Sequence, residues 1–279
     1  MILTPSADTS LIEVAPSNNN GGQSFVLSGR TQNNPRNRGL FKFDLSPIPG
    51  NAVIQSVALT IEVTGQPGDG LANAPFGLYR MLRPWGEGGK IATNNPGQGM
   101  PAGPGEATWL FSFYPTNAWS EPGGAPAMDF LASASSFTFI YGLGQSPYRF
   151  ESTPEFVDDV QGWLNQPQSN YGWMLLCDDE GTIFTARRFG SREDTNNAPL
   201  LEVRYLLPAQ IDWVEKTGSQ FNFGFVARAG QSYTVEFRSA LNSGVWQTLA
   251  NLGSFTETTR VLVVDTALVG QRFYRVATR

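Results

Sequence analysis

The stretch "RGLFKFDLSPIPGNAVIQSVALTIEV", residues 38–63, decides the fold class of this chain. In its first half Phe41, Phe43 and Leu45 alternate with charged residues, and in its second half every other residue from Val57 to Val63 is a branched aliphatic. Side chains of a β-strand alternate between two faces, so this period of two predicts two strands that each bury one face. The Pro- and Gly-containing residues between them supply the turn.

Similar short runs recur along the chain between clusters of Gly, Pro and Asn. Further strands are expected at 24–28, 76–82, 107–113, 172–177, 182–189 and 199–206. This spacing is typical of a two-sheet sandwich. Residues 86–106 are nearly without apolar side chains and predict a surface loop. The N-terminal segment 1–14 is expected to pair with an exposed sheet edge, in its own sandwich or in a neighbouring copy.

One short amphipathic helix is predicted in "STPEFVDDVQGWL", residues 152–164. Its apolar residues follow helical spacing from Phe156 to Leu164, Thr153 can cap it, and Pro154 suits the first helical position. Asp158 and Asp159 lie off the apolar stripe, so we expect both carboxylates to be solvated.

Composition excludes several classes of protein. The chain has 279 residues with 30 Gly and 19 Pro, which favours many short strands. No apolar run reaches the roughly 20 residues of a membrane span, and no basic and apolar leader follows Met1, so the prediction is a soluble chain whose export would require a leader already removed. The lone Cys177 cannot form an intramolecular disulfide and is expected to be a buried apolar residue.

The absence of histidine excludes Ser-His-Asp and Cys-His nucleophiles and His-ligated zinc. Carboxylate pairs, or Lys and Tyr bases, remain available for glycosidase or lyase chemistry. The formal charge of −5 argues against a nucleic-acid partner, because binding of phosphates needs a basic surface.

A domain boundary is expected at residues 207–210, which separates a domain of residues 1–207 from one of 208–279. The second part holds seven Lys and Arg against five Asp and Glu, whereas the whole chain has 19 against 24. Its strict alternation, as in Phe221, Phe223 and Phe225, predicts a smaller sandwich of about seven strands, fibronectin III-like, with the last two strands flanking "ALVG" at 267–270.

Six separated motifs carry a family resemblance. They are the opening stretch, "RPWGEG" followed by "ATW", "FVDDVQGWL", "NYGWMLL", "TARRFGSRE" and "APLLEVRY". In this order they resemble the DNRLRE-type domain of secreted bacterial proteins, over residues 5–206. The resemblance implies a jelly-roll-like, non-catalytic β-sandwich, and one branch of the family is classed as a carbohydrate-binding module for acidic polysaccharide such as alginate.

The C-terminal part carries a second resemblance. "FVARAGQSYTVEFRSALNSGVWQTL" through "RFYRV" is similar to a fibronectin-type tail module of secreted planctomycete and verrucomicrobial proteins. This likeness implies export and names no ligand.

The arginines of "TARRFGSRED" are the first candidates for a ligand site. Alternation along a strand places Arg187 and Arg188 on opposite faces, so at least one of them faces inward or lies at a bulge. A buried arginine must be paired, and Glu193 or Asp44 would be natural partners in a structural salt bridge. Alternatively Arg187, Arg188 and Arg192 bind a sugar acid, because the guanidinium fork matches a carboxylate.

The aromatic residues divide into two sets. One set lies within apolar patterns and is expected in the core: Trp85, Trp109, Trp163 and Trp173. The other set lies in or beside the Pro- and Gly-rich segment 114–151, where exposed rings would stack on sugars: Trp119, Tyr114, Tyr141 and Tyr148. The favoured interpretation of this second set is that its rings pin the loop to the sandwich, because aromatic residues on long connections more often do so.

No metal site can be located. "CDDEG" at 177–181 offers three carboxylates, but adjacent side chains on a strand diverge and the spacing of calcium loops is absent. A structural calcium in the first domain stays open, and no other cofactor is expected.

Three functional classes remain. The leading prediction is a secreted, non-catalytic protein that recognises polysaccharide at the bacterial cell exterior. The alternative is a structural subunit of a cell-surface or extracellular filament that assembles through strand addition. An enzyme that uses a carboxylate pair ranks last, because no Asp or Glu pair is marked by its surroundings.

Overall fold

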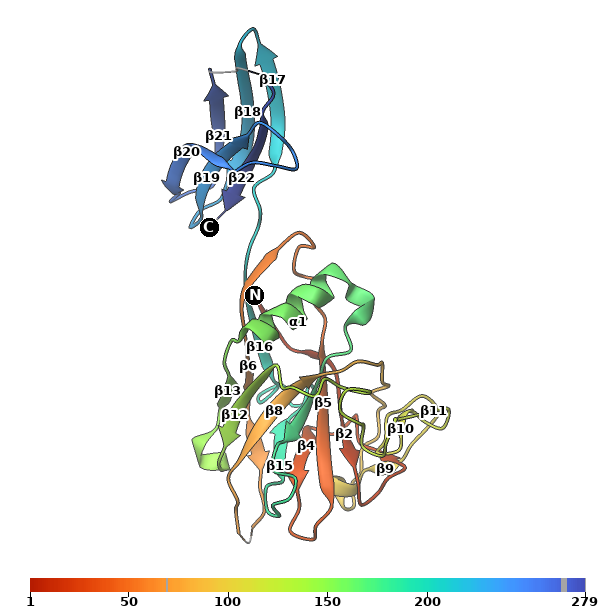
Figure 1. The fold of residues 1–279 in the computed structure, drawn as a ribbon. Helices are drawn as coiled ribbons and strands as arrows, with labels where there is room; N and C mark the ends of the chain where they lie inside the picture. Colours follow the sequence, from red (N-terminus) through yellow and green to blue (C-terminus); the bar gives the residue numbers. More distant parts are fainter. Residues whose placement is uncertain (69, 267–269, 279) are drawn as a thin grey trace. The chain divides into compact units, whose positions relative to one another are not determined.

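The computed structural model describes residues 1–68, 70–266 and 270–278, and the chain forms two compact units (Figure 1). The first consists of Met1–Gly50 and Ile54–Arg204, and the second of Asn51–Val53 and Tyr205–Arg279. Strands dominate both units, so the predicted all-β fold is confirmed. None of the helices in the described ranges has the length and apolar content of a membrane span.

The first unit is built from short strands joined by long connections. Its strands are β1 (Ile2–Leu3), β2 (Pro5–Ile12), β3 (Asn18–Asn19), β4 (Phe25–Arg30), β5 (Arg36–Phe43), β6 (Val53–Ile61), β7 (Val63–Gly65), β8 (Ala74–Arg80), β9 (Met100–Pro101), β10 (Phe111–Phe113), β11 (Asn117–Ala118), β12 (Ser136–Ile140), β13 (Tyr148–Phe150), β14 (Trp173–Cys177), β15 (Arg187–Gly190) and β16 (Leu200–Leu206). Its helices are α1 (Pro154–Asn165) and the 3₁₀ turns η1 (Pro96–Gln98), η2 (Leu143–Gln145) and η3 (Pro167–Ser169).

Two sheets make the sandwich. One has the strand order β1-β16-β6-β13; the other follows the path β12-β8-β14-β5-β4-β15-β7, with β2 also paired to β5. Phe76 on β8 and Phe189 on β15 stand four strands apart on this path, yet their ring centroids lie 5.7 Å apart. The path therefore folds back on itself and encloses a core.

The predicted helix forms as α1. Thr153 caps it by accepting a hydrogen bond from the backbone N–H of Phe156, and Pro154 is its first residue. Phe156 and Trp163 pack on Trp173 of β14, with ring centroids 4.9 and 4.4 Å away. The apolar stripe of α1 therefore closes one part of the core.

Asp159 contradicts its prediction, because only 4% of it is exposed. Its carboxylate accepts hydrogen bonds from Trp173 Nε1 at 2.8 Å and from Ser135 Oγ at 2.5 Å, with Arg80 at 3.4 Å. Burial raises the pKa of Asp159, and these donors oppose that rise. Asp158 is exposed, as predicted.

A second core lies on the other face of the large sheet. Its buried members are Leu11, Leu40, Met81, Ala107, Trp109, Trp119, Phe130 and Met174. Strands β2, β5 and β14 thus bury both faces, whereas alternation in the sequence indicated one. The segment that follows β8 supplies the cover, and of the strand predicted at 107–113 only β10 forms, paired with β11.

The N-terminal segment pairs within its own unit, in agreement with one of the two expectations. Strand β1 pairs with β16, and β2 pairs with β5 so that Thr9 lies opposite Leu40. Both pairings are antiparallel.

The second unit has two sheets of three strands among the residues described, ordered β17-β18-β21 and β20-β19-β22. The strands are β17 (Ile211–Thr217), β18 (Gln220–Ala227), β19 (Ser232–Arg238), β20 (Gln247–Ser254), β21 (Thr259–Asp265) and β22 (Phe273–Thr278). Phe223, Phe225, Tyr233 and Val235 fill the core, as the alternation predicts. The connection predicted at "ALVG" falls on residues 267–269, outside the described residues.

Candidate functional site

Arg187 is buried, with 1% of its surface exposed. Its guanidinium donates four hydrogen bonds of 2.8–3.1 Å to backbone carbonyls, those of Ala72, Tyr141, Phe184 and Ala186. Burial lowers the pKa of Arg187 because desolvation penalises the charged form. The prediction that Glu193 or Asp44 pairs with a buried arginine is wrong: carbonyls from three connections satisfy this cation.

Arg192 is held in ion pairs. Its Nε lies 2.5 Å from Glu87 Oε1 and 3.1 Å from Glu193 Oε1. The "SRE" motif therefore ties the end of β15 to the loop that follows β8. An incoming anion would have to displace two carboxylates from Arg192.

Arg188 differs from both of these arginines. It is exposed, and among the described residues no carboxylate or carbonyl binds its guanidinium. The guanidinium carbon lies 4.4 Å from the ring centroid of Phe25. The aliphatic stem lies against Gly65, where an added Cβ would come within 3.0 Å of Arg188 Cδ. The predicted alternation of Arg187 and Arg188 across the strand is confirmed, and the outward residue is the unpaired cation.

A pocket of about 420 Å³ opens beside Arg188. Its polar lining comes from Thr31, Gln32 and Asn33 of the β4–β5 connection and from Gln66 after β7. Gln66 Oε1 accepts the backbone N–H of Leu143 at 2.6 Å, which orients this side chain. Arg187 also lines the pocket, but backbone carbonyls engage its guanidinium. Arg188 is therefore the available cation, beside amide and hydroxyl groups that can donate and accept hydrogen bonds.

The aromatic candidates lie apart from this pocket. Trp119 is buried, which contradicts its candidate role in sugar stacking, and its Nε1 donates to the carbonyl of Thr108 at 2.8 Å. Tyr148 is buried too, and its hydroxyl donates to the carbonyl of Gly142. Tyr114 is half-buried against Phe111, with ring centroids 5.4 Å apart. These three rings pin connections in place, which was the favoured interpretation.

The remaining aromatic predictions hold except at Trp85. Trp109, Trp163 and Trp173 are buried, while Trp85 is half-buried and packs against the second core. Tyr141 is exposed, as expected for a residue that could meet a ligand.

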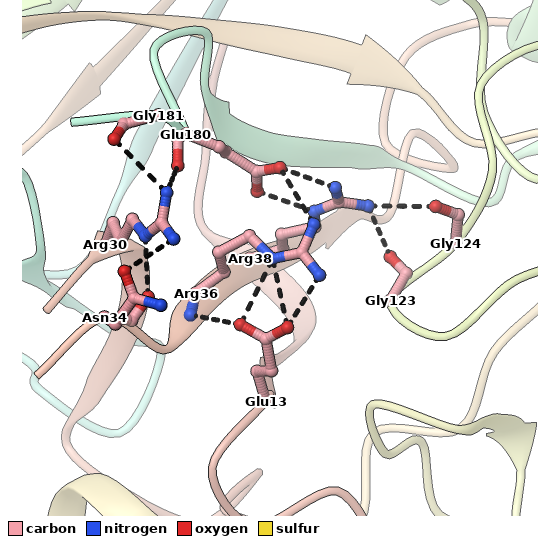
Figure 2. Close-up of polar contacts among 9 residues, drawn as sticks. All are labelled: Glu13, Arg30, Asn34, Arg36, Arg38, Gly123, Gly124, Glu180 and Gly181. Atoms are coloured by element: carbon pink, nitrogen blue, oxygen red, sulfur yellow. Dashed lines mark hydrogen bonds and ion pairs between the residues drawn. The ribbon is translucent and has the colours of Figure 1, made fainter. Parts of the chain in front are cut away.

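An arginine network that the sequence analysis missed lies at the same end of the first unit (Figure 2). Arg36 forms a salt bridge of 2.6 Å with Glu13, and Arg38 binds both carboxylate oxygens of Glu180 at 2.8 and 2.7 Å. Arg30 donates to the carbonyl of Glu180 at 2.6 Å and to Asn34. The sequence signal that could have predicted this network is the cluster of arginines at 30, 36 and 38 around "TQNNP".

This network fixes the hairpin that lines the pocket. Arg38 also donates to the carbonyls of Gly123 and Gly124, both at 2.9 Å, and so joins β5 to the second core. A second pocket of about 390 Å³ lies against the network, lined among others by Arg30, Asn33 and Arg36. Asn33 lines both pockets, so the two pockets flank the β4–β5 connection.

The three carboxylates of "CDDEG" diverge, as predicted. Asp178 accepts from the Tyr79 hydroxyl, Asp179 from Thr182, and Glu180 from Arg38. Within the described ranges no group of three His, Cys, Asp or Glu side chains is arranged to hold a metal ion. Cys177 is buried and unbridged, as expected.

Asp8 is a buried carboxyl beside Arg192, which follows β15. Burial raises its pKa to about 8, the backbone N–H of Arg192 opposes the rise, and Glu193 and Glu87 add to it. Folded Asp8 therefore keeps its proton up to about pH 8, whereas the unfolded chain loses it near the ordinary value of 3.8. Stability from this group falls as pH rises between these values.

We expect Asp8→Asn to remove this pH dependence, because the amide keeps an oxygen acceptor and does not ionise. Urea unfolding at pH 5 and pH 9 would measure the free energy of unfolding of both proteins. At pH 9 the variant should be more stable than the native protein, and at pH 5 this difference should be much smaller. The exposed Asp158→Asn serves as control. Equal changes at both pH values would contradict the assignment.

A scan against models of protein families finds no match to this chain. A search among curated proteins finds no match either. The resemblance to the DNRLRE-type domain and to the fibronectin-type tail module stays a prediction.

Proposed function

We propose that this protein binds polysaccharide through the pocket beside Arg188, with acidic sugar residues as its preferred ligand. The observation that carries the proposal is the exposed Arg188 guanidinium, which no described carboxylate neutralises although the chain as a whole is acidic. The neighbouring arginines are engaged with carbonyls or carboxylates. Arg188 alone of the three predicted arginines is free for an external anion.

Pre-organisation supports this role. The ring of Phe25 and the backbone at Gly65 hold the long side chain in place, so less conformational entropy is lost when a ligand binds. A guanidinium binds a uronate carboxylate through two parallel hydrogen bonds. The side chains of Gln32, Asn33 and Gln66 would meet the sugar hydroxyls.

A non-catalytic role fits the same pocket. Its described lining has no Asp or Glu, and hydrolysis of a glycosidic bond ordinarily uses two carboxyl groups. We further propose that the protein acts outside the bacterial cell, as the family resemblance implies, with the second unit as a spacer.

We expect Arg188→Gln to weaken binding to polygalacturonate by about 10- to 100-fold, because charge-assisted hydrogen bonds to the carboxylate are lost. Isothermal titration calorimetry with oligomers of defined length would measure the change. Methyl-esterified oligomers of equal length lack the charge, so native protein should bind them no better than the variant does.

The matched control is Arg149→Gln, which removes another exposed arginine, one that is ion-paired with Glu202. Its affinity should stay within about twofold of the native value, and binding by native protein should weaken as salt rises. Loss of affinity in both variants, or in neither, would reject Arg188 as the anion site.

A further inference from the structure

Strand β12 forms one end of the large sheet and pairs only with β8 among the described strands (Figure 1). Its register places Phe137 opposite Gly77 and Phe139 opposite Pro75. Both phenylalanines point away from the sandwich core, with 62% and 52% of their surface exposed. Tyr141 continues this aromatic row past the end of the strand and is also exposed.

The backbone of β12 also has unpaired groups at these residues, because β13 packs near β12 without pairing with it. The carbonyl of Pro75 accepts from Asp178 on the β14 side, whereas the carbonyl of Leu78 accepts from Ser135 on the β12 side. Because backbone groups alternate along a strand, alternate β12 residues from Ser136 bond to β8. The N–H and C=O groups of Phe137 and Phe139 point to the open edge, and no described residue binds them.

Two other edges of the first unit are protected, those of β13 and β2. Strand β13 is three residues long and carries the ion-paired Arg149. Along β2, the backbone N–H of Asp8 donates to Glu87 and that of Ser10 donates to Asn20. Charged residues and side-chain caps of this kind prevent edge-to-edge pairing. Strand β12 carries no charged residue, and side chains cap only its two flanks, where Thr153 Oγ1 donates to the Ser135 carbonyl and the Tyr148 hydroxyl accepts from the Tyr141 N–H.

The absence of charged residues around β12 indicates which partner this edge would bind. Residues 130–148, which contain β12 and its flanks, include no Asp, Glu, Lys or Arg, while the whole chain carries a formal charge of −5. A second copy brings the same charges, so self-association is favoured where the surface is neutral. The neutral aromatic edge fits a second copy of itself better than it fits a charged peptide.

We propose that two copies of this protein pair through β12, antiparallel, about a twofold axis at Thr138. In this register Phe137 of each copy lies opposite Phe139 of the other, and their outward backbone groups form the hydrogen-bonded pairs. Aromatic side chains then meet across the strands on the outer face. The sheet becomes continuous through both copies, and the contact is isologous and closed. The inference is independent of glycan binding.

The first test is the mass of the full-length protein over a concentration series. Native protein should shift from monomer to dimer in sedimentation velocity, and the double variant Phe137→Lys, Phe139→Lys should stay monomeric because like charges oppose pairing. The two side chains are exposed, so the variant should keep its far-UV spectrum and melting temperature. Met128→Lys, at an exposed apolar residue elsewhere in the unit, should dimerise like native protein.

The second test reports the register. A twofold axis at Thr138 brings the two copies of this residue together as a non-hydrogen-bonded pair with Cα atoms about 4.5 Å apart, within reach of a disulfide. Thr138→Cys should give a covalent dimer under mild oxidation, whereas Thr60→Cys on the interior strand β6 should not. Native protein, whose single Cys177 is buried, gives the background.

Two outcomes would overturn the inference. One is a native protein that stays monomeric at every concentration, with no covalent dimer from Thr138→Cys. The other is a dimer that persists in the double lysine variant.

Discussion

Arg187→Met is expected to lower the free energy of unfolding of the first unit by about 3–5 kcal/mol. The native guanidinium joins connections that precede β8, follow β12 and precede β15, through carbonyls that include those of Ala72 and Tyr141. Methionine fills similar space but donates nothing, so the buried carbonyls lose their donors and each loss carries a desolvation cost. Urea denaturation followed by near-UV circular dichroism would measure the change.

The neighbouring residue provides the matched control. Arg188→Met removes an exposed arginine from the same strand and should change stability by about 0.5 kcal/mol or less. Arg187→Lys keeps the charge but concentrates its donors on one nitrogen, so it should recover only part of the loss. An unfolding midpoint for Arg187→Met that equals the Arg188→Met value would contradict the role of Arg187.

Trp109→Ala is the second large effect, with an expected loss of about 3–5 kcal/mol. Trp109 is buried in the second core, and the guanidinium carbons of Arg36 and Arg38 lie 5.1 and 5.5 Å from its ring centroid. Gly123 packs against the same indole. Truncation would open a cavity beneath the residues between β8 and β12 and remove both cation–π contacts.

Hydrogen exchange measured by mass spectrometry would locate this effect. We expect faster exchange in residues 82–134, while β6 and β16 in the other sheet keep their protection. Trp213→Ala, at a partly exposed tryptophan of the second unit, should leave exchange in 82–134 unchanged. Uniform acceleration across the first unit would mean that the second core does not open separately.

Local pattern predicted several elements of the fold, although only β15 forms within the strand expected at 182–189. Alternation around Phe41 and Val57 predicted β5 and β6, and the cap and stripe between Thr153 and Leu164 predicted α1. It also predicted that Arg187 and Arg188 face opposite ways. These inferences succeed because strand and helix periodicities depend only on neighbouring residues.

Local pattern failed where a distant segment decides burial. Asp159 lies off the apolar stripe of its helix, yet the approach of Trp173 and Ser135 buries it. Trp119 follows a Pro- and Gly-rich loop, yet this loop covers a sheet face and encloses the indole. The exposure of a side chain depends on which distant segment packs over it, and the local sequence pattern does not identify that segment.

By itself, the sequence determined an all-β chain with one capped helix, and the absence of histidine limited its chemistry. Only the tertiary structure decided which arginine is free: carbonyls from three connections engage Arg187, carboxylates engage Arg192, and Arg188 is left beside a pocket. It also decided that β12 is an open edge. The physical reason is that strand pairing and charge pairing join residues far apart in the chain, whereas periodicity reports only the local backbone.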